Sequence, residues 1–109
     1  MDSFSVSKIF YALSEPTRRE ILELLSDKGQ LSATDIYGEF SMSHPAVSQH
    51  LKVLRETDLV RVEKKAQQRL YKVNPERISE LDNWLKQFQT HWEKSFDKLD
   101  KLLATEKDK

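Results

Sequence analysis

The chain has 109 residues, a length typical of one domain, of which 38% are apolar and 33% are charged. It contains no cysteine, which excludes disulfides, thiol catalysis and thiolate metal sites, and its formal charge is zero. No stretch reaches the roughly 18 consecutive apolar residues of a membrane span, and the first residues lack the pattern of a signal peptide, so we expect a soluble, cytoplasmic protein without a membrane partner.

Hydrophobic residues at helical spacing predict three helices in the first 40 residues. Ser14 is positioned to cap the second helix, Pro16 lies in its first turn, and Gly29 marks its end. Ser32 is positioned to cap the third helix, which is short. The three helices are expected over residues 5–13, about 15–28 and 33–40.

A fourth helix and a hairpin follow. Ser43 is expected to cap this helix, which has Pro45 in its first turn and runs to about Thr57. Two β-like runs, residues 59–63 and 69–73, flank the polar stretch KKAQQ and predict a hairpin. The inward positions of the fourth helix are expected to be Val47, Leu51 and Leu54, and the outward ones Pro45, Gln49, Lys52 and Val53.

The longest predicted helix begins after Asn74 and reaches about residue 104. Its apolar residues are separated by 3, 4, 3, 4, 7 and 3 positions, which is a heptad-like pattern. We expect a single domain over residues 1–104, with 75–104 as its C-terminal helix, and a frayed tail over 105–109. The residues of the pattern are Ile78, Leu81, Leu85, Phe88, Trp92, Leu99 and Leu102.

The order of these elements indicates a DNA-binding fold. Two short helices joined by a tight polar turn and followed by a basic hairpin match a winged helix-turn-helix, so the fold class is mainly α with a small β-hairpin. In such a unit the second helix, here residues 43–56, enters the major groove of double-stranded DNA. Positive charge gathers in the same region, because residues 41–73 have 7 basic and 3 acidic residues.

Gln49 is the best candidate for reading a base, because its amide can donate and accept hydrogen bonds with adenine. Ala46 can touch a thymine methyl group, and His44 is a further candidate contact at the N-terminal end of the helix. Three residues of this helix suit phosphates or base edges, namely Ser43, Ser48 and Lys52. The candidate phosphate ligands of the hairpin are Arg61, Lys64, Lys65 and Arg69.

The runs LSEPTRREILELL, MSHPAVSQHLKVLRETDLV and RLYKVNPERISELDNWL resemble the ArsR/SmtB family of winged-helix repressors, over about nine-tenths of the chain. The resemblance implies a homodimer through the first and last helices, and repression of a nearby operon or of its own gene. The symmetry of such a dimer predicts an inverted-repeat operator.

Metal sensing in that family often uses cysteines in the helix before the recognition helix, or Asp/His pairs in the last helix. This chain departs from both patterns, because it has no cysteine and its last helix has one histidine, His91, followed three residues later by Lys94. It resembles the members without a metal sensor, and we expect no metal site and no cofactor. The wing tip, KKAQQR, also lacks the glycine that is common in the family, which favours a longer or more mobile hairpin.

Alternatives stay open at this stage. No Ser/His/Asp set, glycine-rich phosphate loop or metal-spaced cluster occurs, so we do not expect an enzyme. The main rival is a protein-interaction module that has lost DNA binding and pairs its last helix with a different partner. A second rival is a repressor with a metal or small-molecule effector of unknown identity. An effector could occupy a cavity between subunits lined by Trp84, Phe88, Trp92 and Phe96.

Overall fold

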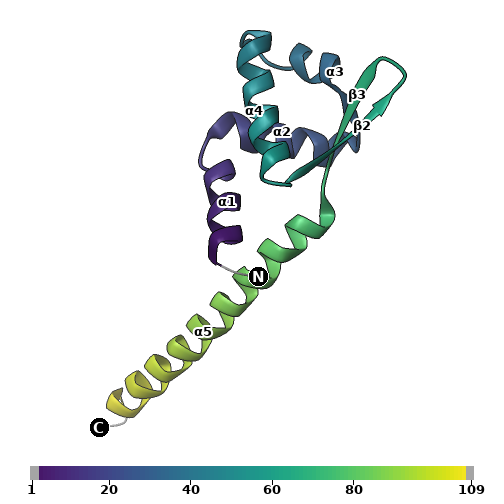
Figure 1. Ribbon diagram of the computed structural model, residues 1–109. Helices are drawn as coiled ribbons and strands as arrows, with labels where there is room; N and C mark the ends of the chain where they lie inside the picture. The colour runs from purple at the N-terminus through teal and green to yellow at the C-terminus, as the bar shows by residue number, and fades with distance from the viewer. Residues whose placement is uncertain (1–2, 108–109) are drawn as a thin grey trace.

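The computed structural model describes the backbone of residues 3–107 and the side chains of residues 5–105 (Figure 1). Within these residues the chain forms five helices and one three-stranded antiparallel sheet, which confirms the predicted winged-helix fold class. The helices are α1 (Ser3–Leu13), α2 (Pro16–Lys28), α3 (Ala33–Gly38), α4 (His44–Glu56) and α5 (Pro75–Lys107). The strands are β1 (Leu31–Ser32), β2 (Val60–Lys65) and β3 (Gln68–Val73).

Capping residues define where α2 begins and ends. The predicted cap at Ser14 is wrong, because the Glu15 carboxylate accepts the hydrogen bond from the backbone N–H of Arg18, at 3.1 Å. Ser14 instead donates both its hydroxyl and its backbone N–H to the carbonyl of Tyr11, at the end of α1. Gly29 ends α2 as predicted, and its φ of 87° is in the region that favours glycine.

The hydrophobic core lies where α1, α2, α3 and α4 meet the base of the hairpin. Val47, Leu51 and Leu54 are buried in it, as predicted from their spacing. The expectation that Val53 points outward is wrong, since its side chain is only 9% exposed. The C-terminal half of α4 packs more widely against the body than one face, because Val53 is buried beside Leu51 and Leu54, while Lys52 and Arg55 stay exposed.

The hairpin of β2 and β3 projects from this body (Figure 1). Its pairing runs from Val60 opposite Val73 to Lys65 opposite Gln68, so a two-residue turn closes the tip. Ala66 occupies that turn with a φ of 56°, a conformation that glycine would adopt more easily. The short strand β1, which pairs with β3, was not predicted from the sequence because two residues carry no alternation pattern.

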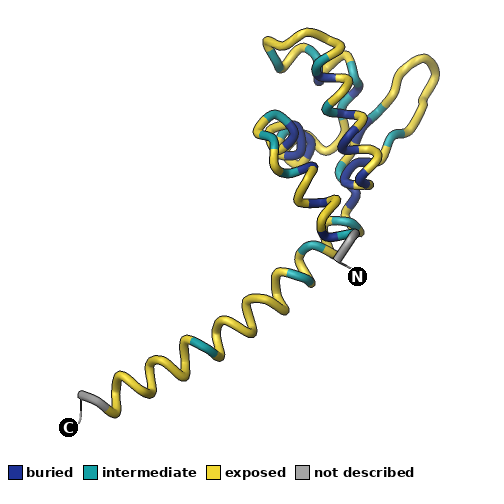
Figure 2. The backbone as a smooth tube through the Cα atoms, turned by 60° about the vertical axis from the view of Figure 1, so that its left-hand side comes forward, coloured by how far each residue is buried: buried dark blue, intermediate teal, exposed yellow. Residues whose placement is uncertain are grey.

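Helix α5 is anchored to the body only near its start. Leu81 packs against the core, whereas the rest of the helix extends away and is almost fully exposed (Figure 2). The molecule is therefore elongated, with extents of 72 × 29 × 22 Å. The helix continues to Lys107, beyond the expected end near residue 104; residues 108–109 of the expected tail lie outside the described residues. Among the described helices, none has the length and apolar character needed to cross a membrane.

Candidate DNA-binding interface

The N-terminal half of α4 presents the candidate base-reading residues to solvent. Ser43 caps the helix, and its hydroxyl accepts from the backbone N–H of Ala46 at 3.3 Å. Ala46 is half-buried, whereas Gln49 is exposed and makes no hydrogen bond to any residue that the structure describes. The other predicted residues of this helix are also exposed, namely Ser43, His44, Ser48 and Lys52. The predicted face is thus open to solvent, as it must be for the helix to enter a DNA groove.

Helix α3 holds two of these side chains in place through Tyr37. The Tyr37 ring stacks on the His44 imidazole, with centroids 4.5 Å apart and planes 13° from parallel. The Tyr37 hydroxyl is 2.6 Å from the Ser48 hydroxyl. Sequence reasoning missed Tyr37, because its partners lie across a turn and only its position in the helix before the recognition helix hints at the contact.

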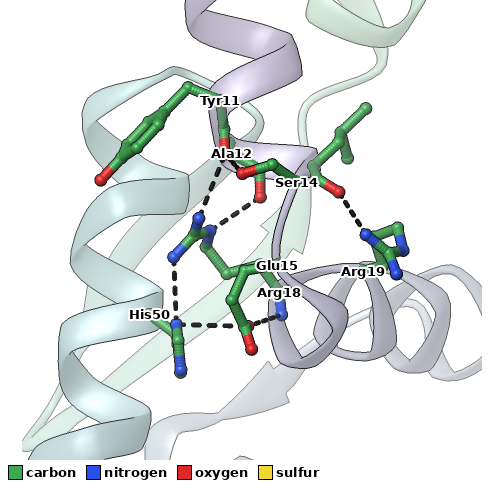
Figure 3. Close-up of polar contacts among 8 residues, drawn as sticks. Tyr11, Ala12, Ser14, Glu15, Arg18, Arg19 and His50 are labelled. Carbon is green, nitrogen blue, oxygen red and sulfur yellow. Dashed lines mark hydrogen bonds and ion pairs between the residues drawn. The ribbon is translucent and has the colours of Figure 1, made fainter.

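Polar side chains also fix α4 from behind, at the corner between α1 and α2 (Figure 3). Arg18 is only 7% exposed and donates to the carbonyls of Ala12 and Tyr11, at 2.7 and 3.1 Å. Its Nη1 lies 3.3 Å from Nδ1 of His50, and the Glu15 carboxylate lies 3.6 Å from the same nitrogen. His50 therefore faces the body and helps to orient α4, leaving the opposite side of the helix for a ligand.

The two faces of the hairpin divide its basic residues. Side chains directly opposite on paired strands share a face, so Lys64 and Arg69 lie on the face that Val62 and Tyr71 use to contact the core. Lys65 lies on the other face near the tip. All three are exposed and have no ion pair with a described residue, so their charges are available for phosphate.

Arg61 differs from the other predicted wing residues. It lies at the base of the hairpin, opposite Lys72, and its Nη2 is 2.8 Å from a carboxylate oxygen of Glu76 at the start of α5. The structure thus groups Lys64, Lys65 and Arg69 near the tip and leaves Arg61 apart with an internal partner. Over the described residues, no group of three or more His, Cys, Asp or Glu side chains is arranged to hold a metal ion.

Comparisons with known proteins agree with this geometry. Residues 15–62 match the family described as bacterial regulatory protein, arsR family. The chain is 35% identical over 83 residues to the transcriptional repressor SdpR of Bacillus subtilis (strain 168), which covers 76% of this chain and 91% of that protein. The chain belongs to the arsR family. It is also 38% identical over 77 residues to an arsenical resistance operon repressor of Staphylococcus xylosus, covering 71% of this chain and 73% of the relative.

Solved structures of the arsR family have the same fold. The crystal structure of an ArsR family transcriptional regulator superimposes with a TM-score of 0.77 at 28% identity, covering 85% of this chain and 95% of that one. An ArsR-like regulator from Rhodococcus sp. RHA1 gives a TM-score of 0.80 at 23% identity, over 93% of this chain and 92% of the other, and supports the fold alone. This arsR-family chain is therefore a DNA-binding transcriptional regulator and not an enzyme.

The arsR-family match begins at the cap of α2 and ends within β2. It includes the whole of α3 and α4, and with them every candidate residue of the recognition helix. The tip of the wing and all of α5 lie outside it. The individual DNA contacts of the helix and of the wing stay predictions, and each can be tested by substituting one exposed side chain.

Proposed function

We propose that the chain is a homodimeric repressor that binds an inverted-repeat operator and responds to no metal. The observation that carries this proposal is the free outer face of α4, which is held from behind by Arg18 and from the side by Tyr37. A helix fixed on two sides is preorganised, so little conformational entropy is lost when it enters the major groove.

Each group of exposed side chains has a proposed role. Gln49 reads an adenine, Ala46 touches a thymine methyl group, and His44 contacts the DNA beside them. Ser43, Ser48 and Lys52 bind phosphates or base edges, and the wing residues Lys64, Lys65 and Arg69 bind phosphates. Arg61 can join them only by leaving Glu76, so we expect it to contribute least.

Dimerisation is supported by the apolar surface that α1 and α5 share. The rings of Phe10 and Trp84 meet in a T-shaped arrangement at a centroid distance of 5.4 Å, which joins the two helices into one surface. Tyr11 on α1 is also exposed. A contiguous apolar surface of this kind is unusual on a monomer and fits a symmetric interface, in which the same patch of two copies meets. On α5 the surface includes Ile78, Leu85, Phe88, Trp92, Phe96, Leu99, Leu102 and Leu103.

Repression is supported by two relatives that are themselves named repressors. A dimer of such small subunits blocks access to a promoter by occupying it, and we expect it to act in the cytoplasm, on the chromosome. The proposal that it responds to no metal rests on the absence of cysteine from the sequence and on the last helix, whose single histidine, His91, is followed three residues later by Lys94 in place of a ligand. No effector is needed for this mode of action.

The direct test is to capture the protein on sheared genomic DNA from its source at about 150 mM salt, with and without zinc, because salt sets the nonspecific affinity. We expect an enriched inverted repeat, near its own promoter if the gene is autoregulated, and the same enrichment with zinc. Loss of enrichment with zinc would contradict metal independence. No enriched sequence under either condition would reject the repressor and favour an interaction module.

Substitutions then separate readers from phosphate ligands. Gln49→Ala should weaken binding to the operator by about 1–3 kcal/mol per half-site while leaving random DNA almost unchanged. Lys64→Ala should weaken binding to all sequences and reduce the salt slope by about 1 per half-site, or about 2 for the dimer. Gln30→Ala, an exposed glutamine outside α4, is the matched control. Equal losses on operator and random DNA in the Gln49 variant would remove Gln49 as a base reader.

A further inference from the structure

A basic groove runs between α3, α4 and the wing. It has a volume of about 210 Å³, and its polar lining comes from all three elements. Tyr37 belongs to α3, Ser48, Lys52 and Arg55 belong to α4, and Arg69 belongs to β3. Neither Tyr37 nor Arg55 belongs to the set of DNA contacts predicted from the sequence, and both line this groove.

The charges of this groove are unbalanced. Lys52 and Arg55 are one helical turn apart on α4, and Arg69 faces them from the wing. No acidic residue lines the groove, and none of the three cations forms an ion pair with a residue that the structure describes. Three positive charges around so small a space repel each other, so an anion between them would stabilise the arrangement.

The two hydroxyls of the groove add hydrogen-bonding capacity. The oxygens of Tyr37 and Ser48 are 2.6 Å apart, and either atom can be the donor of the bond between them. Whichever hydroxyl donates, the other keeps its own proton and can donate it to a ligand. Such a chain of hydrogen bonds polarises the outer O–H group, which strengthens its bond to an anion.

We propose that this groove binds one phosphate of the DNA backbone, a proposal that rests on the DNA-binding function above. If α4 lies in the major groove and the wing reaches the adjacent minor groove, the backbone strand between the two grooves must pass over the space between α4 and the wing. Arg55 and Arg69 then hold the same phosphate from opposite sides, and the outer hydroxyl of the Tyr37–Ser48 pair donates to it.

The test uses DNA in which single phosphates are replaced by uncharged methylphosphonates. Operator duplexes from the capture experiment carry one replacement per half-site at successive positions. At one position the replacement should lower the affinity of the wild-type protein about tenfold. The Arg55→Gln variant should bind unmodified DNA about tenfold more weakly than wild type, and the replacement at that position should lower its affinity little further. Tyr37→Phe keeps the ring that stacks on His44 but removes the hydroxyl. The same replacement should therefore lower its affinity by less than it lowers that of the wild-type protein.

Salt dependence gives a second readout. If Arg55 and Arg69 share one phosphate in each half-site, the double variant Arg55→Gln/Arg69→Gln should reduce the salt slope of the dimer by no more than about 1.8, which is about 0.9 per half-site. Separate phosphates would reduce it by about 3.6, which is about 1.8 per half-site. Lys28→Gln, an exposed cation at the end of α2, is the matched control and should leave affinity and slope unchanged. Equal thermal melting of the variants shows that each is folded.

The outcomes distinguish the groove from the function it rests on. If the wild-type protein binds its operator but Arg55→Gln binds equally well, or shows no coupling to any phosphate position, the groove proposal fails and the repressor stands. If the wild-type protein binds no DNA, both proposals fail. In that case the free protein is titrated with inorganic phosphate, to test whether the groove binds a free anion and not a DNA phosphate. Salt-sensitive binding of phosphate that is lost in Arg55→Gln would show that it does.

Discussion

The winged-helix body and the distal part of α5 use apolar residues in opposite ways. In the body, Ile9 and Leu54 are fully buried among residues of the same chain. In distal α5, Phe96 is 57% exposed and Leu102 is 66% exposed. Both regions are helical and rich in apolar residues, but only the first has its packing partners within the chain. The body therefore carries its own core, whereas the exposed apolar residues of α5 fit the dimer interface proposed above.

Aromatic rings make this contrast sharper. The rings of Trp84 and Phe88 stack at 5.7 Å, and those of Trp92 and Phe96 follow at 5.8 Å along the same side of α5. These contacts lie within one helix, and the rings of Phe88, Trp92 and Phe96 stay largely open to solvent. A long helix in this state is marginal in water, because most helical stability in proteins comes from packing of the apolar face.

The largest effect should follow from Trp92→Asp. Loss of a buried aromatic side chain costs about 3 kcal/mol, so two copies in a dimer cost about 6 kcal/mol and raise the dissociation constant by about four orders of magnitude. Sedimentation velocity over a concentration series should find a monomer, and circular dichroism should find reduced helix content. The control Lys94→Asp adds negative charge on the same exposed helix and should stay dimeric. A dimeric Trp92→Asp protein would refute the α5 interface.

A pair of identical substitutions compares the two regions directly. Leu54→Ala in the body should lower the free energy of unfolding by about 3 kcal/mol, because a fully buried leucine leaves a cavity. Leu102→Ala in α5 should change the unfolding of the body by less than about 0.5 kcal/mol and act on dimerisation instead. Urea unfolding at one fixed protein concentration measures the first effect. Similar losses in both variants would mean that the two regions unfold as one unit.

Helix capping shows how far local sequence patterns reach. Ser32 and Ser43 were predicted as caps and both accept the expected backbone hydrogen bond. Ser14 was predicted as the third cap, but Glu15, which directly precedes Pro16, accepts the backbone hydrogen bond instead. The direction of Val53 was wrong for a different reason, because helical periodicity defines one inward face and not how far neighbouring elements cover its flanks.

The sequence predicted polar positions of α4 that are exposed in the structure but not the side chains that hold the helix, and the DNA contacts themselves stay predictions. Exposed polar positions of a recognition helix follow from the fold class, and Gln49 and Lys52 are exposed as expected. The side chains that hold this helix are separated from it in sequence: Arg18 reaches His50 across 32 residues, and Tyr37 reaches Ser48 across 11. No spacing rule in a single sequence connects such residues, because the contact arises only when the helices pack.

Arg77→Met tests the junction between the two regions. The Arg77 guanidinium donates to the carbonyl of Thr57, at 3.0 Å, and to that of Ser5, at 3.3 Å, which links α5 to the end of α4 and to α1. Methionine keeps most of the apolar contact but removes these charged donors, so we expect a loss of about 2 kcal/mol in unfolding free energy. Dimer affinity should fall as well, since the start of α5 loses its anchor. A change in neither quantity would show that the other contacts of α5, such as those of Leu81 and Trp84, fix the helix without Arg77.

The smallest effect should be a gain in stability confined to the wing. Ala66 has a φ of 56°, a conformation that costs a residue with a side chain about 1 kcal/mol of strain. Glycine avoids that strain but loses about 0.5 kcal/mol more in conformational entropy on folding. Ala66→Gly should therefore raise the free energy of unfolding by about 0.5 kcal/mol and the melting temperature by about 2–4 °C, without changing dimer affinity. The reverse substitution at Gly29, whose φ is 87°, should destabilise the body by about 1 kcal/mol or more, although nothing lies within 4 Å of the added methyl group. A lower melting temperature for Ala66→Gly would mean that the alanine at the tip restricts the unfolded chain more than it strains the turn.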